Sequence, residues 1–194
     1  MKCKIFSPEQ QRVSSWSGGQ TRELYIAGGA ADYAARDFLL RLSSATVETE
    51  HSVFTSLPAY HRALMALSGT VRLAHDGGRP VVLSPFRVDT FDGGAATESW
   101  GRCQDFNVMW AKDAPFTIEL EAPTFYPCQY NGADEDFYYA YRGEFLVAAN
   151  HREYRLAEGE LMYLAGAGYT RVRQVAREPG QMIHVAIQKK DTRG

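Results

Sequence analysis

Residues 60–69 read YHRALMALSG, and the strand-like stretch TVRL follows them at residues 70–73. Residues 137–143, FYYAYRG, followed by EFLV at residues 144–147, repeat this pattern of an apolar run that ends in glycine before a second apolar run. The two glycines, Gly69 and Gly143, are 74 residues apart. A repeat of this length predicts two similar β-units in one chain, and small β-barrels built from such units enclose ligand cavities.

The sequence around the two repeats favours strands throughout. Short runs rich in Val, Tyr, Phe, Thr and Leu alternate with Gly, Pro, Asp and Asn, and long stretches with the apolar period of a helix are missing. Residues 30–36 follow two glycines and are expected to form a surface loop. We predict strands at residues 21–26, 38–48, 62–67, 70–75, 81–83, 103–110, 116–121, 137–141, 145–149, 153–156, 161–164, 170–175 and 182–188.

Each repeat predicts a hairpin followed by a return strand, and this unit resembles a cupin barrel. The second copy, LAEGELMYL at residues 156–164, is the better match to the descending strands of cupins. We therefore expect a mostly β bicupin: two tandem cupin-like, double-stranded β-helix barrels packed intimately as one unit. Residues 1–121 are assigned to the first barrel, with an N-terminal strand and loop, and residues 122–194 to the second.

Composition narrows the classes of partner. The chain has 21 basic and 23 acidic side chains and a pI near 6.2, which gives no electrostatic reason to expect nucleic acid or an anionic membrane. It has no charged-then-apolar leader and no apolar run of about 20 residues, so we expect a cytoplasmic protein. Cys3, Cys103 and Cys128 are far apart and are expected to be reduced. Exposed sheet edges make a homodimer plausible.

The histidines do not have the spacing of a metal site. Cupin enzymes bind a divalent metal through two histidines two residues apart, because alternate residues of a strand point the same way. We therefore predict no metal and no other cofactor. The histidines never stand two apart: His51, His61, His75, His151 and His184.

Four motifs occur in order along the first half of the chain: WSGGQTREL at residues 16–24, FLLRLSSATV at 38–47, FTSLPAYHR at 54–62 and DFNVM at 105–109. This series resembles the HutD/Ves family. The resemblance implies a bicupin without metal, associated with histidine utilisation in many bacteria and with environmental stress in others. For the histidine-linked members it implies binding of a small pathway metabolite, such as a formylated glutamate, that restrains the pathway. Residues 58–62, PAYHR, depart from the family's usual Pro-Gly-x-acid-Arg turn.

Polar residues of the first half share faces of their predicted strands. Arg41 and Ser43 lie on one face, and so do Asp105 and Asn107. With Arg62 nearby, Arg41 would form a cationic end suited to a carboxylate, so a small dicarboxylate or a carboxylated imidazole is the expected guest. The candidate ligand-binding residues are Thr21, Arg22, Glu23, Arg41, Ser43, Arg62, Asp105 and Asn107, with Trp16, Phe54 and Met109 as lid or pocket wall.

Two functions and one purely structural role remain open for these residues. The first function is a non-catalytic protein that binds a small anionic metabolite; the chain has no Ser-His-Asp order, nucleophile elbow, phosphate loop or dinucleotide fingerprint. The second is a metal-independent isomerase or lyase, with Asp105, Glu23 or His61 as general base and an arginine that stabilises an oxyanion. The structural role is a set of ion pairs, such as Arg41 with Asp105, that never meet a ligand.

Overall fold

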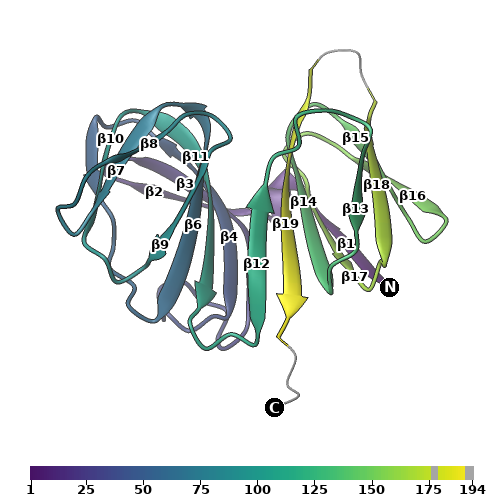
Figure 1. The fold of residues 1–194 in the computed structure, drawn as a ribbon, viewed down its shortest axis with the longest axis horizontal. Coiled ribbons are helices and arrows are strands. Elements are labelled where there is room, and N and C mark those ends of the chain that lie inside the picture. Colours follow the sequence, from purple (N-terminus) through teal and green to yellow (C-terminus); the bar gives the residue numbers. More distant parts are fainter. Residues whose placement is uncertain (176–178, 191–194) are drawn as a thin grey trace. The chain divides into compact units, whose positions relative to one another are not determined.

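Antiparallel strands make up most of the computed structural model, which describes residues 1–175 and 179–190 (Figure 1). The chain divides into two compact units: Gln11–Ala114, called the first barrel, and Met1–Gln10 with Pro115–Gly194, called the second barrel. In the described residues the only helix is the short 3-10 helix η1 (Pro8–Gln10), so no helix there is able to span a membrane.

The first barrel consists of two antiparallel sheets. Its larger sheet has the order β2-β3-β4-β11-β6-β9, and its smaller sheet has the order β5-β10-β7-β8. An apolar core lies between the sheets, because Leu64 and Ala66 of the larger sheet pack with Leu73 and Leu83 of the smaller one. The strands are β2 (Arg12–Trp16), β3 (Gly19–Ala27), β4 (Leu40–Val47), β5 (His51–Val53), β6 (Tyr60–Gly69), β7 (Val71–His75), β8 (Val81–Leu83), β9 (Val88–Asp92), β10 (Thr97–Trp100) and β11 (Cys103–Ala111).

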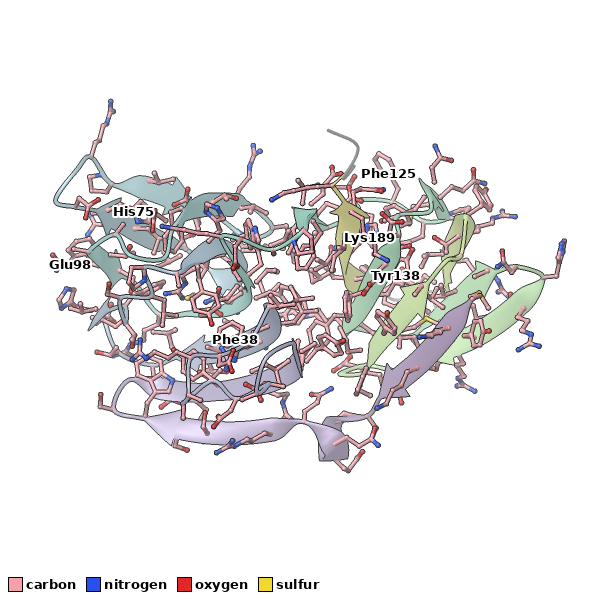
Figure 2. All side chains as sticks on the ribbon, turned by 90° about the horizontal axis from the view of Figure 1, so that it is seen from below. Phe38, His75, Glu98, Phe125, Tyr138 and Lys189 are labelled. Atoms are coloured by element: carbon pink, nitrogen blue, oxygen red, sulfur yellow. The ribbon has the colours of Figure 1, made fainter. Side chains whose placement is uncertain are left out.

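The second barrel repeats this plan. Its sheets have the orders β1-β17-β14-β19-β12 and β13-β18-β15-β16. Figure 2 shows Tyr138 among the side chains that fill this unit, where it is fully buried with Phe145 and Met182. The strands are β1 (Lys2–Phe6), β12 (Phe116–Glu121), β13 (Cys128–Asn131), β14 (Glu135–Arg142), β15 (Phe145–Ala149), β16 (Arg152–Leu156), β17 (Leu161–Ala165), β18 (Tyr169–Gln174) and β19 (Gln181–Lys189).

The two barrels share their strand pairing, which confirms the predicted bicupin fold. In the first barrel β11 pairs with β4 and β6, and in the second β19 pairs with β12 and β14. Likewise β10 pairs with β5 and β7, as β18 pairs with β13 and β15. Gly69 and Gly143, the repeated glycines, both have positive φ, at 74° and 76°. Each of these glycines lies where the chain passes from one sheet of its barrel to the other, and glycine adopts this conformation without a steric penalty.

The division of the chain differs from the expected one at both ends of the first barrel. We expected residues 1–121 to form the first barrel, but β12 pairs along its whole length with β19 of the second. The N-terminal strand β1 pairs with β17 and belongs to the second barrel as well. Backbone pairing decided these assignments, and it is not visible in local composition. The expected second barrel, residues 122–194, also includes residues 176–178 and 191–194, which lie outside the described residues.

Six strands are absent from the sequence prediction because they are short or polar. The sequence of β2, RVSSW, does not alternate apolar and polar residues along its length, and all five residues are exposed. Strands β5, β10 and β13 have three or four residues each. The other two unpredicted strands are β1 and β9.

Candidate functional site

The inner face of the larger sheet of the first barrel brings the predicted polar residues together. Strand β11 lies at its centre, between β4 and β6, so residues two apart on β11 form successive rows with their neighbours. This face is the inner one because Leu64 and Ala66 of β6 belong to the apolar core. The three rows are Arg41–Met109–Arg62, Ser43–Asn107–Leu64 and Ala45–Asp105–Ala66.

A cavity of about 330 Å³ opens over these rows. Its volume is that of a site for a small molecule. Every residue that lines it comes from the first barrel. The lining consists of Ser14, Trp16, Thr21, Tyr33, Arg41, Ser43, Ala45, Val47, Ser52, Val53, Phe54, Thr55, Arg62, Asp105, Asn107 and Met109.

Arg62 is a buried cation without a carboxylate in hydrogen-bond contact. Only 5% of the residue is exposed, and its guanidinium carbon lies over the rings of Phe54, at 4.6 Å, and Phe91, at 5.4 Å. Burial lowers the pKa of Arg62 to about 10, so it stays protonated at neutral pH. Its Nε has no hydrogen-bond partner among the residues that the structure describes. The aromatic rings hold the side chain in place while this donor remains available.

Arg41 is held differently, by an ion pair. Its Nε donates to Glu23 Oε2 at 2.7 Å, and its Nη1 donates to Ser43 Oγ at 3.2 Å. The ring of Tyr33 lies 4.2 Å from the guanidinium carbon, in a cation–π contact. The charge of Arg41 is therefore already balanced by Glu23, whereas Arg62 supplies the charge available to an anion. The ion pair that we considered between Arg41 and Asp105 is replaced by the one with Glu23.

Asp105 and Asn107 complete the polar end of the cavity. Asp105 Oδ1 accepts a hydrogen bond from the backbone N–H of Ala45 at 3.2 Å. Burial raises the pKa of Asp105 to about 7, although this hydrogen bond and the charges of Arg62 and Arg41 act in the opposite direction. Asn107 Oδ1 is buried and has no hydrogen-bond partner within residues 1–175 and 179–190. Near neutral pH the cavity therefore contains a carboxyl group that is only partly ionised and an amide oxygen that is free to accept.

The loop before β4 delivers Tyr33 to the cavity. Tyr60 holds this loop, because its hydroxyl donates to the Arg36 carbonyl at 2.8 Å and accepts from the Phe38 N–H at 3.3 Å. The Tyr60 ring also stacks on Phe38, with centroids 4.3 Å apart. Tyr60 lies within the PAYHR segment that departs from the family pattern. The departures themselves are Ala59 and His61, on either side of Tyr60, and Tyr60 anchors the loop that covers Arg41.

Apolar side chains surround the mouth of the cavity. Trp16, at the end of β2, is 40% exposed, and Val53 of β5 is 68% exposed. A Cβ at Gly18 would lie 2.2 Å from the Trp16 ring, so only glycine lets the indole pack against this turn. The cavity therefore has a polar floor and an apolar mouth.

Most of the predicted site residues line the cavity, and three do not. Arg22 neighbours Thr21 on β3 and points to the opposite face, because side chains alternate along a strand. His61 alternates with Arg62 in the same way, and its ring lies 5.3 Å from that of Trp110. Glu23 reaches the site only through Arg41. The predicted residues in the lining are Trp16, Thr21, Arg41, Ser43, Phe54, Arg62, Asp105, Asn107 and Met109.

The sequence prediction missed seven of the lining residues. Tyr33 stands in the segment predicted to be a surface loop, and its signal was an aromatic residue in a loop between two strands of the site. Val53 and Thr55 flank the predicted Phe54. The others are Ser14, Ala45, Val47 and Ser52, small or apolar residues without a functional signature.

The second barrel uses the corresponding position differently. In the strand register His184 stands opposite Glu121 and Tyr138, as Asn107 stands opposite Ser43 and Leu64 in the first barrel. The His184 Nδ1 lies 2.9 Å from Glu121 Oε1, and its Nε2 lies 2.9 Å from Asp136 Oδ1. Both ring nitrogens are therefore engaged within the protein. A space of about 440 Å³ adjoins His184 and is lined by Thr117, Ile118, Glu119, Glu121, Tyr130, Asn131, Ala133, His184, Ala186 and Gln188.

The first-barrel cavity does not fit a metal ion. Asp105 is the one carboxylate among its lining residues, and the Arg62 guanidinium repels a cation. Across residues 1–175 and 179–190, no group of three or more His, Cys, Asp or Glu side chains is placed to hold a metal ion.

Comparison with known proteins supports a family and a fold. Residues 8–183 match the family model described as HutD. No sequence among the curated proteins matches the chain. Similar solved structures include PA5104, a conserved protein of unknown function from Pseudomonas aeruginosa PAO1 (TM-score 0.84, 22% identity, covering 97% of this chain and 100% of that one). HutD from Pseudomonas fluorescens SBW25 has a TM-score of 0.78 and 18% identity, again covering 97% and 100%.

A more distant likeness is to a metal-containing cupin. Bacillus subtilis oxalate decarboxylase, whose Mn(II) centres have been studied, has a TM-score of 0.68 and 10% identity, covering 98% of this chain and 78% of that one. At this level of identity the likeness concerns the fold alone.

Proposed function

The chain belongs to the HutD family, and from this premise we propose that it is a non-catalytic binding protein whose first barrel holds a small carboxylate metabolite. One observation carries the proposal: Arg62 is a buried guanidinium that lines the cavity and has an Nε without a partner. Buried charges in proteins are normally paired. A carboxylate in the cavity supplies the missing partner in the planar geometry that guanidinium groups favour.

The charge balance of the cavity also favours an anion. Arg41 is neutralised by Glu23, and Asp105 is only partly ionised near neutral pH, so the charge of Arg62 is not fully compensated. A ligand with one carboxylate at this end restores neutrality. The apolar mouth formed by Trp16, Val53 and Phe54 then covers the remainder of the molecule.

Family membership suggests the biological setting of this binding. We infer that the ligand is an intermediate of histidine degradation, formylglutamate or a similar molecule, and that the bound state modulates histidine utilisation. A small intracellular carboxylate reports on flux through a pathway, and a binding protein without turnover is suited to sensing it. The homodimer and the cytoplasmic location expected from the sequence belong to the same proposal.

Calorimetry on the full chain tests the proposal. Formate, formylglutamate, urocanate, glutamate and histidine are titrated into the protein, and we expect at least one carboxylate to bind. Arg62→Met keeps an unbranched, mainly apolar side chain and removes the charge. We expect it to weaken binding about 30-fold or more, because loss of a buried charge partner costs about 2 kcal/mol or more.

Two further variants separate charge from geometry. Arg79 is exposed and outside the cavity, so Arg79→Gln is the matched control and should bind like the wild type. Arg62→Lys keeps the charge but loses the planar fork, and it should have intermediate affinity. The proposal is refuted if no carboxylate binds, or if Arg62→Met and Arg79→Gln have the same affinity.

A metal-independent enzyme is the second candidate, and one observation favours it. Asp105 lines the cavity with its pKa raised by burial to about 7, the value suited to a general base at neutral pH, and Arg62 is close enough to affect that pKa. Turnover of urocanate, followed by ultraviolet absorbance after treatment with a chelator, tests this candidate. Activity that survives the chelator and is lost in Asp105→Asn would establish catalysis, and absence of turnover would leave the binding function alone.

A further inference from the structure

In the first-barrel cavity, two buried polar atoms of opposite hydrogen-bonding character lack a partner in the described part of the chain. Arg62 Nε is a donor and Asn107 Oδ1 is an acceptor. Both residues line the cavity, and they are only 5% and 7% exposed. Buried polar atoms are almost always paired in folded proteins, because an unpaired one loses its hydration without compensation. The cavity is therefore complementary to a molecule that offers both an acceptor and a donor.

The strand register limits how far apart these two groups of the ligand are. Arg62 stands in the same row as Met109, and Asn107 is two residues away on β11. Two residues of a strand span roughly 7 Å. The long Arg62 side chain can shorten the distance between its guanidinium and Asn107. One small molecule can therefore reach both groups. The acceptor and the donor thus belong to one compact ligand.

The charges around Asn107 select the kind of donor. Arg41 and Arg62 both line the same small cavity, and Asp105 is the one carboxylate in the lining. Arg41 is paired with Glu23, but a free ammonium group would still lie in the same cavity as the Arg62 guanidinium, which has no such partner, and would be repelled by it. A neutral N–H or O–H group meets no such repulsion and still donates to Asn107 Oδ1.

We infer that Asn107 is a specificity-determining residue, and that the ligand carries a neutral N–H or O–H donor in addition to its carboxylate. This inference rests on the proposed function and narrows it. Hydroxy acids and N-acylated amino acids belong to the accepted class, whereas simple fatty acids and free α-amino acids do not. Asn107 accepts from the donor while Arg62 holds the carboxylate.

Three ligands of one shape test the inference. Lactate, isobutyrate and alanine have the same carbon frame and differ only in a hydroxyl, a methyl or an ammonium group on Cα. N-acetylglycine and levulinate form a second pair, in which N–H is replaced by CH₂. We expect lactate to bind about tenfold or more tightly than isobutyrate and alanine, and N-acetylglycine to exceed levulinate similarly, because a site built to pair with a polar group rejects the analogue without it.

An isosteric variant assigns the effect to Asn107. Asn107→Leu removes the acceptor at nearly constant volume, and it should bind both members of each pair with similar affinity. Asn131→Leu, an exposed site in the second barrel, is the matched control and should retain the wild-type preference. Thermal unfolding of each variant checks the fold. If Asn107→Leu does not fold, the ligand series on the wild-type protein still tests the inference.

The possible results distinguish the inference from the function on which it rests. If none of these carboxylates binds at millimolar concentration, the proposed function fails and the inference fails with it. If lactate and isobutyrate bind equally, the cavity binds carboxylates but the inference is overturned. If the preference is present and survives Asn107→Leu, the donor is recognised elsewhere and the role of Asn107 is overturned.

Discussion

The affinity of the first barrel for a carboxylate should fall as the pH rises through the pKa of Asp105. Burial raises this pKa to about 7, and the side chain lies in the cavity that we propose as the binding site. Below pH 7 the group is mainly neutral and does not oppose an anion. Above pH 7 it is an anion in the same cavity and repels the ligand.

The size of the effect follows from the linkage between protonation and binding. If only the protein with a neutral Asp105 binds, the apparent Kd increases by a factor of 1 plus ten to the power of pH minus pKa. With a pKa of about 7, binding should be about tenfold weaker at pH 8 than at pH 6, which corresponds to about 1.4 kcal/mol. Arg62 stays protonated in this range, because its pKa is about 10.

Calorimetry with lactate at pH 6, 7 and 8 measures this dependence, because lactate stays ionised throughout and carries the hydroxyl donor that we infer for the ligand. Buffers that differ in ionisation enthalpy report the proton taken up on binding. Asp105→Asn keeps a neutral acceptor for the Ala45 N–H, and its affinity should not vary with pH. Asp113→Asn, at an exposed position outside the cavity, should follow the wild type.

Stability provides an independent measure of the same group. The pKa of Asp105 in the folded protein is raised above its usual 3.8, so the folded state holds the proton more tightly than the unfolded state. The contribution of Asp105 to stability should therefore decrease as the pH rises from about 4 to about 7. Asp105→Asn should gain stability relative to the wild type over this range. The reasoning is refuted if carboxylate affinity is constant or increases between pH 6 and 8, or if Asp105→Asn keeps the wild-type dependence.

Three further predictions concern the loop, the mouth and the second barrel. Tyr33→Leu removes the cation–π contact on Arg41 and should weaken carboxylate binding about fivefold, from a loss of about 1 kcal/mol; calorimetry that shows unchanged affinity would contradict this role. Gly18→Val should displace the Trp16 indole and increase the quenching of tryptophan fluorescence by iodide, whereas unchanged quenching would mean that the turn accommodates the side chain. Burial lowers the pKa of His184, but its hydrogen bonds to two carboxylates outweigh burial and raise the pKa above 6.5. The contribution of His184 to stability is therefore fully present below pH 6.5 and is lost as the pH rises through the folded pKa. His184→Gln should cost about 3 kcal/mol in denaturant unfolding at pH 6 and less at pH 9; a cost that is independent of pH would show that the histidine is neutral.

Local patterns in the sequence were sufficient for the architecture. The repeated glycine-ended runs at residues 60–69 and 137–143 became β6 and β14, which occupy the same place in the two barrels. The bounds of β8, β12 and β15 agree with the predicted ranges 81–83, 116–121 and 145–149. Strand alternation also placed Arg41, Asp105 and Asn107 on one face. These features depend on neighbours in the chain, so they can be predicted from the sequence.

Long-range contacts decided the rest. The pairing of β12 with β19 moved residues 116–121 into the second barrel, and the loop held by Tyr60 carried Tyr33 to Arg41. Alternation could not show that Glu23 neutralises Arg41 while the Arg62 Nε stays without a partner. Which charges meet depends on side chains that come from different strands and reach across a folded face. The sequence determined the two barrels and the polar face, and only the tertiary structure determined which groups on that face are left to bind a ligand.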